Sequence, residues 1–242
     1  MFNKQQTVEK IQQALWADLQ KNCLDNVISL IVYGTGNDGQ YITAGSENNF
    51  LIVTTQLAGK ELQQIAKLQK QWSKKYRVYP LFLTKQDILT SADIFPIEFQ
   101  NMKESYTVAA GEDVFKNLEI PLVHLRAQCE YSLKGKLIIL RQGYVENPHN
   151  LQALIKNSTP AFLLVFKNIL KLLGVKPAPS SPEIIRALCV QAGLDEQIII
   201  DISLIAEGSV KCSFKELEAH FDSYLQQLQK LAGFVDQLDV KK

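Results

Sequence analysis

Two apolar runs rich in β-branched residues, separated by a glycine-rich loop, constrain the fold of this chain more than any other feature. The first run is Asn26–Gly34 (NVISLIVYG) and the second is Phe50–Thr55 (FLIVTT). Short apolar runs of this composition are typical of strands that are buried on both faces of a sheet. The sequence therefore predicts a strand–loop–strand unit, with the polar loop TGNDGQYITAGSENN between the strands.

The residues that follow extend this unit into a mixed α/β domain. Helical periodicity predicts one helix over residues 8–22, with Thr7 as its cap, and another over residues 59–75. Further strands are predicted at Arg77–Thr84, where Pro80 indicates a sheet edge, at Phe95–Phe99, and at Tyr106–Ala110.

The second half of the chain predicts helices only. A long amphipathic helix is predicted from Leu122 to Tyr144. Pro160 is predicted to open another helix, capped by Ser158 or Thr159, and Ser213–Glu216 forms a capping box that opens the last one. The sequence thus predicts an α+β fold: a small mixed-sheet domain over residues 1–120, followed by an all-α helical bundle over residues 121–242.

Composition argues against several classes of function. The 242 residues carry 26 Lys and Arg against 25 Asp and Glu, a net charge of +1, whereas a protein that grips long nucleic acid usually shows a basic excess. No apolar run approaches the roughly 18 residues of a membrane span, and the N-terminus lacks the apolar core of a secretory signal. The cysteines and histidines show no zinc-binding spacing. We therefore expect a cytoplasmic protein without a membrane or long nucleic acid as partner.

The loop between the two predicted strands carries a motif. Gly34-Thr35 closes the first strand, Gly39 lies in the loop, and Ser46-Glu47-Asn48-Asn49 leads into the second strand. This pattern resembles the signature of the nucleotidyltransferase superfamily, the fold of DNA polymerase β and of the aminoglycoside nucleotidyltransferases. That signature runs from a strand through Gly-Ser and an Arg-Gly loop to Ser-Asp-x-Asp on the next strand. An α/β domain followed by helices is compatible with the resemblance over the whole chain.

The resemblance implies a site for an NTP and Mg²⁺. Glu47 and Asn49 stand at the two metal-ligand positions, since residues two apart on a strand point to the same face. Such ions would stabilise the attacking and leaving oxygens of an in-line displacement. The positions implied to bind the nucleotide phosphates are Gly34, Thr35, Gly39 and Ser46.

The superfamily usually adds a third carboxylate from a neighbouring strand, which activates the acceptor hydroxyl or holds a second metal ion. Glu98 is the candidate, because it lies on the polar side of the alternation of Phe95, Ile97 and Phe99. Asp93 is the alternative. The resemblance therefore implies Glu47, Asn49 and Glu98 as the catalytic set.

Three positions depart from the superfamily pattern. Glu47 is one methylene longer than aspartate, and Asn49 is neutral and a weaker ligand for Mg²⁺. Asp38 stands where arginine is common, so it places negative charge near the expected phosphates. These departures leave open whether catalysis survives.

The sequence is therefore compatible with two main functions. The first is an enzyme that uses Mg²⁺ to transfer a nucleoside monophosphate from an NTP to a hydroxyl group of a small molecule or a protein. The second is a catalytically degenerate protein of the same fold that acts as a binding or regulatory module and assembles with itself or a partner through its apolar helices. A toxin–antitoxin-type antitoxin is a third reading, for which a chain of 242 residues is long.

Overall fold

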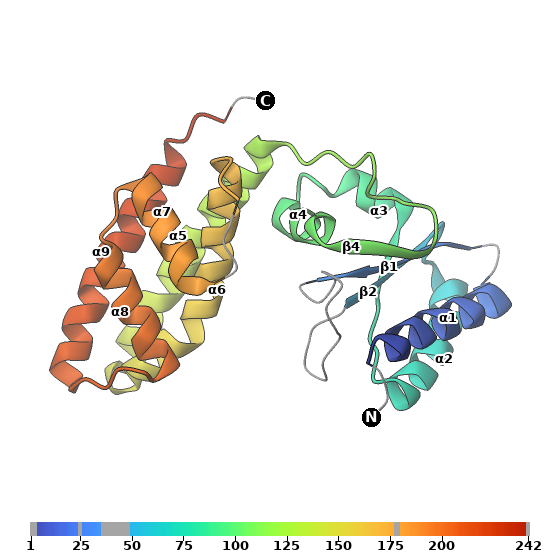
Figure 1. The fold of residues 1–242 in the computed structure, drawn as a ribbon, viewed down its shortest axis with the longest axis horizontal. Coiled ribbons are helices and arrows are strands. Elements are labelled where there is room, and N and C mark those ends of the chain that lie inside the picture. Colours follow the sequence, from blue (N-terminus) through green and yellow to red (C-terminus); the bar gives the residue numbers. More distant parts are fainter. Residues whose placement is uncertain (1–3, 24–25, 35–48, 177–179, 241–242) are drawn as a thin grey trace. The chain divides into compact units, whose positions relative to one another are not determined.

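A four-stranded mixed sheet forms the centre of the first of two units, Met1–Ile120 (Figure 1). The computed structural model describes residues 4–23, 26–34, 49–176 and 180–240. The strands are β1 (Val27–Tyr33), β2 (Asn49–Thr54), β3 (Leu81–Thr84) and β4 (Tyr106–Gly111). Their order is β3-β2-β1-β4; β1 pairs antiparallel with β2 and with β4, and β2 pairs parallel with β3.

Helices cover both faces of this sheet (Figure 1). Leu30, Val32 and Ile52 form one core with α1 (Lys4–Cys23) and α2 (Gly59–Lys75). Their strand neighbours Ile31, Leu51 and Val53 form the other core with α3 (Lys85–Thr90) and α4 (Pro96–Glu104). Because successive side chains of a strand point to opposite faces, β1 and β2 are buried on both sides, as their apolar sequences predict.

The strand predicted at Phe95–Phe99 is wrong, because these residues lead into and begin the helix α4. Pro96 occupies its first turn, and Phe99 and Met102, three residues apart, are buried against the sheet. The alternation of Phe95, Ile97 and Phe99 spans too few residues to separate a strand from the start of a helix. Glu98 is therefore an exposed residue in the first turn of a helix rather than a strand residue.

Two element boundaries also differ from their predictions. The helix α1 begins at Lys4, so Thr7 lies inside the helix rather than before its first residue. The strand β3 begins at Leu81 rather than Arg77, directly after Pro80, which has no N–H group to donate to a ladder. As Pro80 indicates, β3 is an edge strand.

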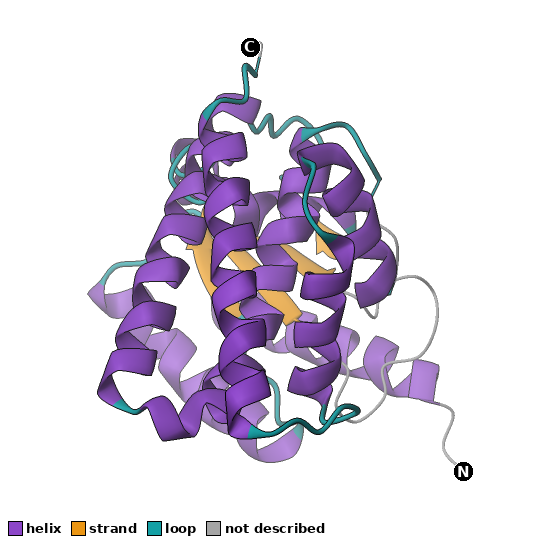
Figure 2. Ribbon diagram, turned by 90° about the vertical axis from the view of Figure 1, so that its left-hand side faces the viewer, coloured by secondary structure: helices purple, strands orange, loops and turns teal. Residues whose placement is uncertain are grey.

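The second unit, Pro121–Lys242, consists of helices that lie side by side, as both Figure 1 and Figure 2 show. In its described part these are α5 (Leu122–Glu146), the short 3₁₀ helix η1 (Pro148–Asn150), α6 (Leu151–Leu172), α7 (Ser181–Ala192), α8 (Glu196–Glu207) and α9 (Phe214–Asp236). The predicted helix from Leu122 is α5, and the predicted capping box opens α9, where the Ser213 side chain accepts from the Glu216 N–H. An α+β fold with a small mixed sheet followed by a helical bundle is thus confirmed.

Pro160 does not open a helix; it lies in the interior of α6. The hydroxyl groups of Ser158 and Thr159 donate to the carbonyl of Ile155, one turn earlier, and so act within the helix instead of capping it. The buried residues Leu151, Ile155 and Phe162 continue as one stripe across the proline. Burial of that stripe outweighs the helix-breaking preference of Pro160.

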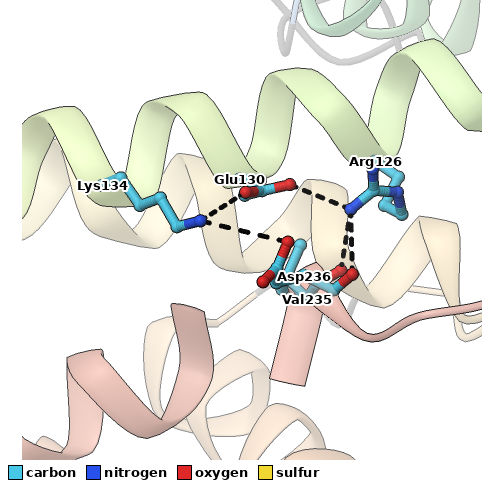
Figure 3. A network of polar contacts seen from close by, with 5 residues as sticks. All are labelled: Arg126, Glu130, Lys134, Val235 and Asp236. Atoms are coloured by element: carbon cyan, nitrogen blue, oxygen red, sulfur yellow. Dashed lines mark hydrogen bonds and ion pairs between the residues drawn. The ribbon is translucent and has the colours of Figure 1, made fainter. Parts of the chain in front are cut away.

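A polar network joins α5 to the end of α9 (Figure 3). Arg126 donates to Glu130 Oε2 (2.9 Å) and to the carbonyl oxygens of Val235 and Asp236 (3.3 Å each). Lys134 donates to the other oxygen of Glu130 and lies 4.0 Å from the carboxylate of Asp236. The network thereby links α5 to carbonyl groups in the last turn of α9.

None of the helices in the described ranges combines the length and the apolar composition that crossing a bilayer requires.

Candidate active site

One end of the sheet brings together the described residues of the predicted motif. Asn49, the first residue of β2, pairs with Tyr33, the last residue of β1, and Tyr33 pairs on its other side with Tyr106, the first residue of β4. Asn49 alternates with Leu51 and Val53, so it belongs to the sheet face that packs against α4. The result is a row of Asn49, Tyr33 and Tyr106 across three strands.

Gly34 leaves β1 in a conformation that favours glycine, with φ of 114°. Its N–H donates to the carbonyl of Ser105 (3.0 Å), and the Ser105 hydroxyl donates back to the carbonyl of Gly34 (3.0 Å). Two hydrogen bonds therefore fix the turn after β1 against the residue that precedes β4. Gly34 is the first residue of the loop that carries the predicted motif.

The hydroxyl of Tyr106 is held by a carboxylate. It donates to both oxygens of Asp113 (3.2 Å each), and Asp113 Oδ1 also accepts from the N–H groups of Phe115 and Lys116 (3.1 Å each). Burial raises the pKa of Tyr106, and the negative charge of Asp113 raises it further. Burial also raises the pKa of Tyr33. Both phenols therefore stay neutral around neutral pH, and the single O–H group of Tyr106 is committed to Asp113.

The loop motif does not include Tyr33, Ser105, Tyr106 or Asp113. The sequence does contain an indication for two of them, since Tyr33 and Tyr106 each stand at the end of a predicted strand. Antiparallel pairing of those strands would have placed them together. The pairing of β1 with β4 across more than 70 positions of sequence is not contained in any local pattern.

The predicted site residues are only partly described by the structure. Gly34 and Asn49 lie at the same end of the sheet, as the motif requires. Glu98 is exposed on α4, and Asp93 is exposed in the turn between α3 and α4. The remaining motif positions lie outside the described residues: Thr35, Asp38, Gly39, Ser46 and Glu47.

Carboxylates are absent from the described strands. None of β1 to β4, as bounded above, contains Asp or Glu. Within the described ranges, no three His, Cys, Asp or Glu side chains gather closely enough to hold a metal ion. Any third carboxylate of the site therefore has to come from a helix or a loop.

Charge is distributed unevenly across the sheet. Residues 59–79, which include α2, carry six basic residues and one acidic residue. Residues 85–120, which include α3 and α4, carry three basic and seven acidic residues. Because α2 and the pair α3 and α4 cover opposite faces, the first unit has a basic side and an acidic side.

Comparison with known proteins identifies the fold. No family model and no curated protein sequence matches this chain. Among solved structures, the crystal structure of spectinomycin adenyltransferase AAD(9) from Enterococcus faecialis with ATP and spectinomycin is similar, with a TM-score of 0.52 and 14% sequence identity. The match covers 94% of this chain and 100% of that chain, so it extends through both units. The resemblance drawn from the loop motif is confirmed: the protein has a nucleotidyltransferase-like fold.

Proposed function

We propose that this protein transfers a nucleoside monophosphate from an NTP to a hydroxyl group of a small molecule. The observation that carries the proposal is the likeness in fold, over both units, to an adenyltransferase whose structure contains ATP and spectinomycin. A likeness that includes the helical unit supports an acceptor as well as a nucleotide. A protein hydroxyl is the alternative acceptor.

The donor set fits a weakly held magnesium ion. Asn49 is exposed at the start of β2, and its amide oxygen is a hard ligand of the kind that Mg²⁺ accepts. Glu47, two residues earlier in the sequence, adds one carboxylate. When bound, the ion would stabilise the charge that develops on the phosphate oxygens. Since Asn49 is neutral, we expect weaker metal affinity than two carboxylates would give.

The chain's own residues would position the reactants. Backbone groups around Gly34, whose turn is fixed by Ser105, would bind the phosphates together with Thr35, Gly39 and Ser46. The acceptor oxygen would attack the α-phosphorus, the bond to the β-phosphate oxygen would break, and pyrophosphate would leave. Glu98 would take the proton from the acceptor hydroxyl, and Asp93 is the alternative base.

The test is calorimetric titration of the protein with ATP in the presence of Mg²⁺, together with mass spectrometry of a panel of polyhydroxyl compounds after incubation. We expect binding in the parent and addition of a nucleotide to at least one compound. Glu47→Gln keeps the shape of the side chain but removes its charge, and we expect it to abolish transfer. Glu119→Gln, an exposed change between β4 and α5, is the matched control and should leave transfer unchanged. Transfer that survives Glu47→Gln would contradict the role of Glu47.

A second function is favoured by the neutral Asn49 and by the strands without acidic residues: a non-catalytic module of the same fold. It predicts that the parent binds no nucleotide in the presence of Mg²⁺. The double variant Asn49→Asp with Asp38→Arg would then gain metal-dependent ATP binding, because it restores one carboxylate and reverses one charge. Binding by the parent itself would favour the enzyme instead.

A further inference from the structure

A group of exposed cations lies where α2 ends. Lys74 and Lys75 belong to the last turn of α2, Tyr76 caps it, and Arg77 follows. The ammonium group of Lys75 lies over the ring of Tyr76, 5.0 Å from its centroid. Within the described ranges, no ion pair involves Lys74 or Arg77. These two side chains therefore present positive charge to the solvent.

The strand register places the start of β3, and with it the connection from α2, at the end of the sheet that carries the candidate site. The strands β2 and β3 run parallel, and Leu51 pairs with Leu81. Residues just before Leu81 consequently lie alongside residues just before Leu51, where Asn49 begins β2. The same end of the sheet carries Tyr33 and Gly34. Asn49 begins β2, and Arg77 lies in the connection that leads from α2 into β3, so both precede neighbouring parallel strands at this end of the sheet.

Arg77 also has a backbone conformation that arginine rarely adopts. Its φ is 56°, and in the described part of the chain every other residue with a positive φ is a glycine. Arg77 is the second residue after the end of α2, a position at which helices commonly place glycine in this left-handed conformation. A side chain there has an energetic cost that glycine avoids. Such an outlier is a reason to look for a function of the side chain.

Stabilisation of the helix end explains only some of these basic residues. Basic residues in the last turn of a helix offset its negative end, and that accounts for Lys74 and Lys75. It does not account for Arg77, which lies beyond the helix in a conformation that disfavours it. A guanidinium group is well suited to phosphate, because its planar fork donates two parallel hydrogen bonds.

We infer that Arg77, supported by Lys74, binds the phosphates of the nucleotide, and so supplies from the α2–β3 connection the positive charge that the loop lacks at Asp38. The inference rests on the proposed function and names a binding residue for it. It also explains why the sequence keeps a strained arginine at a position that glycine would occupy without cost.

The test is calorimetric titration with inorganic tripolyphosphate without metal, and with ATP and Mg²⁺, on the parent, Arg77→Gly, Arg77→Lys and Lys60→Ala. Arg77→Gly removes the charge and relieves the strain, so we expect about a tenfold or greater loss of affinity with an unchanged or higher melting temperature. Arg77→Lys should retain more affinity than Arg77→Gly. Lys60 is exposed at the other end of α2, about 21 Å along the helix from Lys74, and its variant should change affinity less than twofold.

Three results would overturn the inference: no binding of tripolyphosphate by the parent, equal affinity of the parent and Arg77→Gly, or equal losses in Arg77→Gly and Lys60→Ala. Its failure is distinguishable from failure of the proposed function. Binding of tripolyphosphate that depends on Arg77, without nucleotide transfer to any acceptor, would support the phosphate site and contradict the enzyme. Transfer with an unchanged KM for ATP in Arg77→Gly would support the enzyme and contradict the phosphate site at Arg77.

Discussion

Glu130 holds together the polar network through which α5 contacts the end of α9. Its two oxygens accept from Lys134 and Arg126, and Arg126 continues to the carbonyl groups at the end of α9. The hydrogen bond from Lys134 is the largest cause that lowers the pKa of Glu130, and the bond from Arg126 adds to it. The carboxylate is therefore bound more favourably in the folded protein than the protonated acid.

This shift predicts how stability depends on pH. Because the folded pKa of Glu130 is lowered, its contribution is fully present above the ordinary glutamate pKa of about 4.5 and is lost as the pH falls through the lower folded value. We expect Glu130→Gln to reduce the free energy of unfolding by about 0.5–1 kcal/mol at neutral pH. The difference from the parent should shrink towards pH 3, measured by far-ultraviolet circular dichroism. Glu207→Gln, an exposed change at the end of α8, is the control; a constant difference at all pH values would contradict the prediction.

At the scale of elements, the sequence predicts those that local patterns determine. The helix at 59–75 is found as α2, and the capping box at Ser213 opens α9. The short alternation at Phe95–Phe99 gives the wrong element, because tertiary packing of Phe99 and Met102 decides between strand and helix. Of the site, the sequence could predict Gly34 and Asn49, which belong to one local motif. Tyr33 and Tyr106 required the pairing of β1 with β4, which is not local.

Pro160 gives a prediction at the same scale. It lies in the interior of α6 and is exposed, so its ring breaks a helical hydrogen bond without contributing buried surface. We expect Pro160→Ala to raise the free energy of unfolding by about 1–3 kcal/mol, measured by chemical denaturation. The matched control is Pro182→Ala in the first turn of α7, where proline costs little. A loss of stability in Pro160→Ala would mean that packing of α6 requires a bend at the proline.

The whole molecule consists of two units that can be observed separately. Trp16 and Trp72 both lie in the first unit, where they pack in the core with α1 and α2, and the second unit has no tryptophan. Tryptophan fluorescence therefore reports on unfolding of the first unit alone. Circular dichroism, dominated by helices, reports on both units.

Gly111 and Gly135 allow a test of how the units unfold. Gly111 in β4 has φ of 85°, and a Cβ there would lie 2.1 Å from the carbonyl oxygen of Ile28. We expect Gly111→Ala to destabilise the first unit by about 2–4 kcal/mol. The midpoint of the unfolding transition followed by tryptophan fluorescence should therefore fall. Gly135→Ala in α5 meets nothing within 4 Å and should stabilise the second unit by about 1 kcal/mol without moving the fluorescence transition. Shifts of both signals together in either variant would show that the two units unfold as one.

The opposite charges on the two sides of the first unit give that unit an electric dipole. A diffusing anion is attracted to the side of α2 and repelled from the side of α3 and α4, so its encounters with this unit are oriented before any contact forms. Ionic strength weakens this orientation, because the Debye length falls to about 8 Å in physiological salt. The rate at which an anion associates with the first unit should therefore depend on salt concentration more strongly than a net charge of +1 would suggest.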